Sequence, residues 1–159
     1  MNPTFYFTLL AITIVVLFIV NRGRAGQRKT KQKFDEKVSP IMDVVGEMLS
    51  DGDETLSKLY RFVNDKEEAI VAARVSDKEK VILGTSEEVL ALRRKDISDV
   101  VLDIDESDGM LNKAEVRVTT SDGRLLSYEF ITKPIEAKKY IAKTLRGYAE
   151  RLNSLLLMD

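Results

Sequence analysis

An uncharged run close to the N-terminus constrains this chain more than any other feature. Residues 3–20 read PTFYFTLLAITIVVLFIV, eighteen positions without a charged side chain. A helix of that length measures about 27 Å, close to the thickness of the hydrocarbon core of a bilayer. The run is apolar on every face, unlike an amphipathic core helix, and no basic residue precedes it, unlike a cleaved signal peptide. We therefore expect a transmembrane helix over residues 1–21.

A basic segment follows the run and predicts its orientation. Residues 21–33 contain no acidic residue and six basic ones, namely Arg22, Arg24, Arg28, Lys29, Lys31 and Lys33. Lys and Arg beside a membrane span favour its cytoplasmic end. The pattern predicts a single-pass protein of a bacterial inner membrane, with the N-terminus outside and the C-terminal part in the cytoplasm. We interpret residues 22–37 as a basic juxtamembrane linker, which either contacts anionic lipid heads or only sets the topology.

The composition of the remaining chain excludes several classes of function. The full chain has a net charge of −1 and the basic segment carries +6, so the remainder carries −7. An acidic body argues against binding to nucleic acid, which needs a clustered basic face. The sequence has no His, Cys or Trp, which removes the commonest general base and metal ligand, thiol chemistry and disulfides. We expect no enzyme activity, no cofactor, no metal and no small-molecule substrate.

The first part of the body, residues 38–66, has the pattern of a helical hairpin. Ser39 and Pro40 suit the cap and first position of a helix, and apolar residues then repeat at helical spacing up to Gly52. A second short helix is indicated by the apolar residues Leu56, Leu59, Tyr60 and Val63.

From residue 67 the apolar period changes to that of β-strands. The alternation predicts six strands, over residues 69–75, 80–84, 88–93, 97–105, 114–120 and 124–132. Turn residues separate them, for example Ser121-Asp122-Gly123, and every connection is short. Neighbouring strands should therefore pair in an antiparallel meander.

A long helix is predicted to follow the strands and to begin at Pro134. Its apolar residues step by three and four positions along one seam, namely Ile141, Leu145, Tyr148, Leu152 and Leu155. The simplest interpretation is a helix that covers one face of the sheet. The apolar end, Leu155-Leu156-Leu157-Met158, either enters the core or contacts a partner.

Six short antiparallel strands followed by one long helix resemble the pleckstrin-homology-like fold, in particular its bacterial and GRAM-type members. The stretch VILGTSEEVLALRRKDISDV, residues 81–100, is similar to their pattern, in which a strand ends in Thr or Ser and an I-x-x-V step enters a later strand. The fold class expected is α+β: an N-terminal transmembrane helix, short helices, then a partial barrel with a C-terminal helix over residues 67–159.

The resemblance implies a binding platform. Eukaryotic relatives often bind phosphoinositides through basic residues of the first hairpin, but residues 76–80 here read SDKEK, with two acidic residues beside two lysines. That site therefore does not carry over, and a protein becomes the expected ligand. The predicted function is a membrane-anchored adaptor, scaffold or subunit of a membrane complex that binds a protein partner. The alternative is a module that senses anionic lipid, and the C-terminal seam also suits a homo-oligomer.

The candidate contact residues are few. Arg93, Arg94 and Lys95 form a basic cluster that could meet phospholipid heads or an acidic peptide, although we prefer the simpler interpretation of a solvated strand end. Leu155 and Leu156 complete the expected partner surface. Residues 103–109, DIDESDG, have the acids of a calcium loop, but the Gly and Glu that such a loop needs are out of register.

Overall fold

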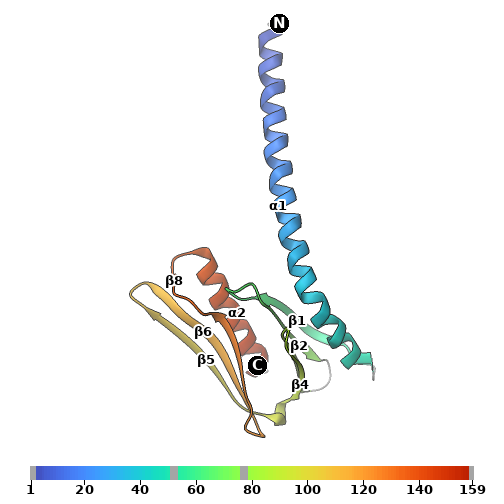
Figure 1. Cartoon of the computed structure of the whole chain (residues 1–159), viewed down its shortest axis with the longest axis vertical. Helices are drawn as coiled ribbons and strands as arrows, with labels where there is room; N and C mark the ends of the chain where they lie inside the picture. The colour runs from blue at the N-terminus through green and yellow to red at the C-terminus, as the bar shows by residue number, and fades with distance from the viewer. Residues whose placement is uncertain (1–2, 51–53, 76–78, 158–159) are drawn as a thin grey trace. The chain divides into compact units, whose positions relative to one another are not determined.

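The protein is an α+β structure with two antiparallel sheets and a C-terminal helix (Figure 1). The computed structural model describes the backbone of residues 3–50, 54–75 and 79–157, and the side chains of residues 26–49, 54–75 and 79–157. The chain divides into two units, residues 1–36 and 37–159, and each is described by itself.

Helix α1 runs from Pro3 to Ser50. Within the described residues, no helix is both long enough and apolar enough to cross a membrane. The side chains of the uncharged run lie outside the described residues. Residues 26–37 of α1 are polar and contain seven charged side chains. The expected fold class, which included a transmembrane helix, is therefore wrong on this point.

Helix α1 also differs from the predicted linker and helix start. Residues 22–37 are helical rather than a flexible linker, because Arg, Lys, Gln and Ala are strong helix formers. Pro40 lies inside α1, so Ser39 does not begin a new helix there. A proline in a helix interior removes one backbone hydrogen bond but does not always end the helix.

The first sheet contains β1 (Leu56–Val63), β2 (Ala69–Val75), β3 (Lys80–Gly84) and β4 (Val89–Arg93), paired antiparallel in that order. β1 corrects the sequence analysis, which predicted a short helix here. Tyr60 and Phe62 point to the core, and they pair with Ala72 and Ile70 of β2. Phe62 is the most buried residue of this strand, and the predicted helical spacing did not include it. The aromatic and β-branched residues of β1 fit a strand that is buried on one face.

The second sheet contains β5 (Ile97–Ser107), β6 (Met110–Thr120) and β7 (Leu125–Ile131), and the short β8 (Ile135–Glu136) pairs with β6. The single-turn 3₁₀-helix η1 (Arg94–Asp96) separates β4 from β5, so the strands do not form one continuous meander. Asp108 and Gly109 both have positive φ in the two-residue turn between β5 and β6, which matches the right-handed twist of a long hairpin.

Helix α2 (Tyr140–Leu157) packs against both sheets (Figure 1). It begins six residues after Pro134, the predicted start, because β8 and a turn occupy the intervening residues. Its buried face is made of Ala142, Leu145, Ala149, Leu152, Leu155 and Leu156. Ile141, which the predicted seam included, is 50% exposed. Phe62, Phe130 and Tyr148 form an aromatic cluster where the helix meets the sheets.

The first sheet is buried on both faces in its two central strands. One face belongs to the main core, and the opposite face of β2 and β3 presents Val71, Ala73, Val75, Ile82 and Gly84. Val38, Ile41 and Val45 of α1 are nearly inaccessible to solvent, and the Cγ2 atom of Ile41 lies 2.5 Å from where a Cβ on Gly84 would stand. Residues 38–45 of α1 therefore cover this face.

The close approach at Gly84 generates a test of this packing. We expect Gly84→Ala to destabilise the fold by about 1–3 kcal/mol, because the added methyl group collides with Ile41. Ile41→Ala removes the colliding atom, so the double variant should be more stable than the sum of the single effects, as measured by urea unfolding. Additive effects would show that α1 does not cover Gly84.

Candidate functional site

The predicted basic cluster is engaged in local structure. The backbone N–H and the Nε of Arg93 donate to the Asp96 carboxylate at 3.2 and 3.1 Å, which lowers the pKa of Asp96. The Nη1 of Arg94 donates to the carbonyl oxygen of Leu157 at 3.1 Å and so satisfies a free carbonyl at the end of α2. Lys95 is exposed. Arg93 and Arg94 thus have structural partners that the sequence did not indicate.

The other predicted contact residues lie apart from one another. Leu155 and Leu156 are 2% and 0% exposed, so they belong to the core and do not form a partner surface. Of the basic segment, Arg28, Lys29, Lys31 and Lys33 are exposed on α1, and the side chains of Arg22 and Arg24 lie outside the described residues.

A cleft with a volume of about 460 Å³ lies beside β7. Its floor is apolar and contains Ile70, Leu90, Leu126 and Tyr128. Its rim is polar and consists of Asn64, Glu68, Thr85, Ser86, Glu87, Glu88, Ser127 and Glu129. The cleft therefore combines an apolar base with four carboxylates, and we refer to it below as the acidic cleft.

The cleft lies along an edge strand. β7 pairs with β6 on one side, and within the described residues no strand pairs with its other side. In an antiparallel strand, every second residue directs its N–H and C=O away from the paired neighbour. Alternate backbone donors and acceptors along residues 125–129 therefore face the acidic cleft and are available to an added strand.

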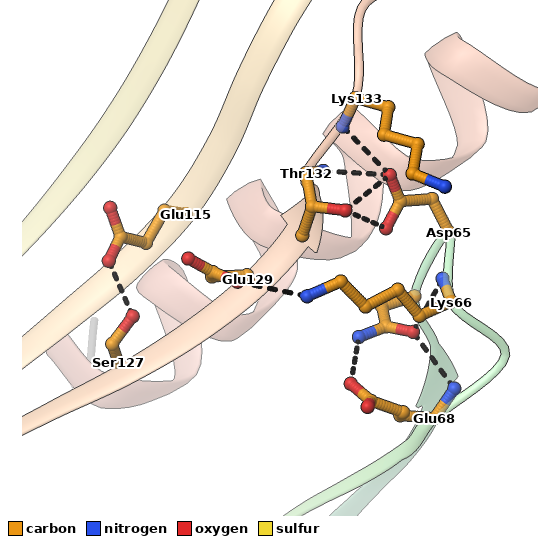
Figure 2. A network of polar contacts seen from close by, with 9 residues as sticks. Asp65, Lys66, Glu68, Glu115, Ser127, Glu129, Thr132 and Lys133 are labelled. Carbon is orange, nitrogen blue, oxygen red and sulfur yellow. Dashed lines mark hydrogen bonds and ion pairs between the residues drawn. The ribbon is translucent and has the colours of Figure 1, made fainter.

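The turn between β1 and β2 closes one end of the cleft. The Asn64 side chain is 6% exposed, accepts the backbone N–H of Lys66 and of Glu68, and donates to the Glu68 carboxylate at 2.8 Å. Glu67 has a φ of 62°, which the tight turn requires. The Lys66 ammonium reaches the Glu129 carboxylate at 3.7 Å (Figure 2). Asn64 thus holds Glu68 and the backbone of Lys66 in place beside the cleft.

Asp65 joins the two sheets at this end. Its backbone N–H donates to the carbonyl oxygen of Phe130 at 3.0 Å. Its carboxylate accepts the backbone N–H of Thr132 at 2.7 Å and of Lys133 at 3.1 Å, and the Thr132 hydroxyl at 3.0 Å (Figure 2). A single carboxylate therefore holds the β1–β2 turn against the end of β7.

An ion pair and a buried phenol mark the other end. Arg124 pairs with Glu88 across the gap between β7 and the β3–β4 turn, which raises the pKa of the guanidinium. Burial, and then the charge of Glu88, raise the pKa of Tyr128 well above its ordinary value. Tyr128 is 6% exposed, and within the described residues its hydroxyl makes no hydrogen bond. The Tyr128 hydroxyl is therefore a neutral hydrogen-bonding group of the cleft that is free to bind a ligand.

A charged network supports β7 from the outer face of the second sheet. Glu115 is 6% exposed and accepts the Ser127 hydroxyl (Figure 2). Lys113 forms ion pairs with both Glu115 and Asp103, and its Nζ lies 2.8 Å from the Asp103 carboxylate. Burial opposes ionisation of Glu115, but the bonds from Lys113 and Ser127 outweigh it and lower its pKa. The hydrogen bond from Lys113 also lowers the pKa of Asp103.

The described residues do not form a metal site. Within the described residues, no group of three or more Asp and Glu side chains could hold a metal ion. Asp103, which begins the calcium-like stretch, is occupied by Lys113. No family model, no curated protein and no solved structure significantly matches the chain. The resemblance to the pleckstrin-homology-like fold therefore stays a prediction.

Sequence reasoning missed the acidic cleft because its parts are distant in the chain. Its rim comes from residues 64–68, 85–88 and 127–129, and each part alone is an ordinary polar turn or strand. One signal was present: Asn64-Asp65-Lys66-Glu67-Glu68 lies between two apolar stretches and has turn composition.

The charged network on β6 generates a prediction about acid. Because the pKa values of Asp103 and Glu115 are lowered, their stabilisation is complete above the ordinary values of 3.8 and 4.5 and is lost as the pH falls through the lowered ones. We expect Glu115→Gln to cost about 1–3 kcal/mol at neutral pH, and the two stability curves to converge in acid, measured by urea unfolding. Asp99→Asn, which removes an exposed carboxylate without an ion pair in the described residues, is the control. A constant difference across the pH range would contradict the role of Glu115.

Proposed function

We propose that this chain is a non-catalytic binding module whose acidic cleft takes an extended, basic segment of a protein partner. It would act as an adaptor, a scaffold or a subunit of a larger complex. The observation that carries the proposal is the free edge of β7 beside a cleft with an apolar floor. An extended peptide that pairs with such an edge gains backbone hydrogen bonds, while its side chains enter the adjacent cleft.

The charge of the rim supports a basic partner. Glu68, Glu87, Glu88 and Glu129 surround the cleft, and only Lys66 and Arg124 pair with members of this set in the described residues. An excess of carboxylates attracts Lys or Arg side chains and speeds their association at low salt. The Tyr128 hydroxyl supplies a further hydrogen-bonding group at the base.

The alternative is a module that senses anionic lipid through the basic segment and through Arg93, Arg94 and Lys95, and the second of these two groups has less support. Arg93 pairs with Asp96 and Arg94 with the end of α2, so only Lys95 has no such engagement in the described residues. The expected placement in a bacterial inner membrane, with the body in the cytoplasm, stays a prediction.

Titration with model peptides tests the proposal. We expect a short synthetic peptide of alternating Lys and Val to bind the full-length chain and to shift the amide NMR signals of residues 125–129. The same peptide with Glu in place of Lys should not bind, because the rim repels it. N-methylation of alternate peptide bonds should abolish binding, because it removes the donors that pair with a strand edge.

Two charge reversals provide a matched comparison. Glu87 is exposed at the rim, so Glu87→Lys should weaken binding of the basic peptide about tenfold, which corresponds to ~1.4 kcal/mol. Asp99 is an exposed acid on β5, so Asp99→Lys changes the net charge equally and should leave the affinity within about twofold. Equal losses in both variants, or shifts outside residues 64–70, 85–90 and 125–129, would contradict binding in the acidic cleft.

A further inference from the structure

The start of α2 carries an exposed apolar pair. Tyr140 is 85% exposed and Ile141 is 50% exposed, and they occupy the first turn of the helix. Tyr140 has the largest exposed fraction among the large hydrophobic residues of the described chain. Neither is needed for the core, which α2 contacts through Ala142 and Leu145 on a different face.

Cations surround this pair. Residues 137–149 contain Lys138, Lys139, Lys143 and Arg146 and no acidic residue. Arg146 forms ion pairs with Glu106 and Glu150. All three lysines are exposed. Among the nearby acids, Glu136 lies 3.7 Å from the Lys139 ammonium, and Asp108 lies at the rim of an adjoining hollow. This otherwise acidic body thus has a local positive surface.

We infer that the start of α2 docks on the surface of an anionic membrane. Two exposed apolar side chains bury far less area than the roughly 800 Å² per partner of a stable protein interface. They do suit shallow insertion, because Tyr is enriched at the headgroup level and Lys side chains extend to anionic heads. The inference goes beyond peptide binding by the acidic cleft, and neither depends on the other.

The strength of such docking depends on charge. Each lysine close to an anionic surface strengthens binding by about fivefold, so reversing three should weaken it by more than about a hundredfold. Salt should weaken it similarly, because charges are screened over about 10 Å at 0.1 M.

The absence of Trp from the chain permits a local test in the full-length protein. In the Tyr140→Trp variant, we expect the indole emission to shift to the blue and to be quenched by brominated acyl chains. This should occur with vesicles of phosphatidylcholine and phosphatidylglycerol, and not with phosphatidylcholine alone. The probe reports on its own surroundings, and a second probe site in the same full-length chain controls for the behaviour of residues 1–36. Leu125→Trp, at a position that is 61% exposed on β7, should show no shift.

Charge reversal completes the test. Adding Lys138→Glu, Lys139→Glu and Lys143→Glu to the Tyr140→Trp variant should abolish the shift, whereas adding Lys95→Glu should not. Circular dichroism checks that each variant folds. An unchanged emission with anionic vesicles, an equal shift with neutral vesicles, or a shift that survives the triple reversal would overturn the inference. A shift with polyglutamate but not with vesicles would also overturn it, in favour of an acidic protein partner.

Discussion

The junction made by Asp65 is the interaction on which the arrangement of the two sheets depends. The Asp65 carboxylate accepts hydrogen bonds from two backbone N–H groups and one hydroxyl of the chain beyond β7. The backbone N–H of Asp65 donates to the carbonyl oxygen of Phe130. Hydrogen bonds to a charged acceptor are about twice as strong as neutral ones. The contact holds the end of β7 and leaves the rest of that strand unpaired on its outer side. The acidic cleft exists because the sheets meet at their ends and not along β7.

A second constraint comes from the first sheet, whose central strands are covered on both faces. Such strands must be apolar at almost every position, and β2 reads AIVAARV for this reason. On one face of the first sheet, Gly84 allows α1 to approach closely. The other face packs against α2 and the second sheet in the main core. The sheet is therefore an apolar base, whereas the turns at its ends, where the acidic cleft lies, carry the polar residues.

Sequence patterns predicted the elements that have one clear period. The strands from Ala69 to Ile131 were placed to within a few residues, because apolar and polar residues alternate and turn residues separate them. β1 was mistaken for a helix because Leu56, Leu59, Tyr60 and Val63 satisfy helical spacing while Phe62 does not. The start of α2 was placed too early because Pro134 suits a helix start, although Ile135 and Glu136 pair with β6.

The candidate site was beyond prediction for a different reason. Asp65 and Thr132 are 67 residues apart, and nothing local to either indicates that they bond. The sequence also predicted contact residues that the structure does not leave free. Arg93 and Arg94 bond to Asp96 and to the end of α2, and Leu155 and Leu156 lie in the core. A charged or apolar run predicts a binding surface only when the fold leaves it without a partner.

The open edge of β7 is the central claim, and hydrogen exchange of backbone amides in the full-length protein tests it most directly. We expect the amides of residues 125–129 to alternate between slow exchange, where they bond to β6, and fast exchange, where they face the acidic cleft. The amides of Asp65, Thr132 and Lys133 should be slow because the junction protects them. Uniformly slow exchange along β7, or fast exchange at Thr132 and Lys133, would contradict the account.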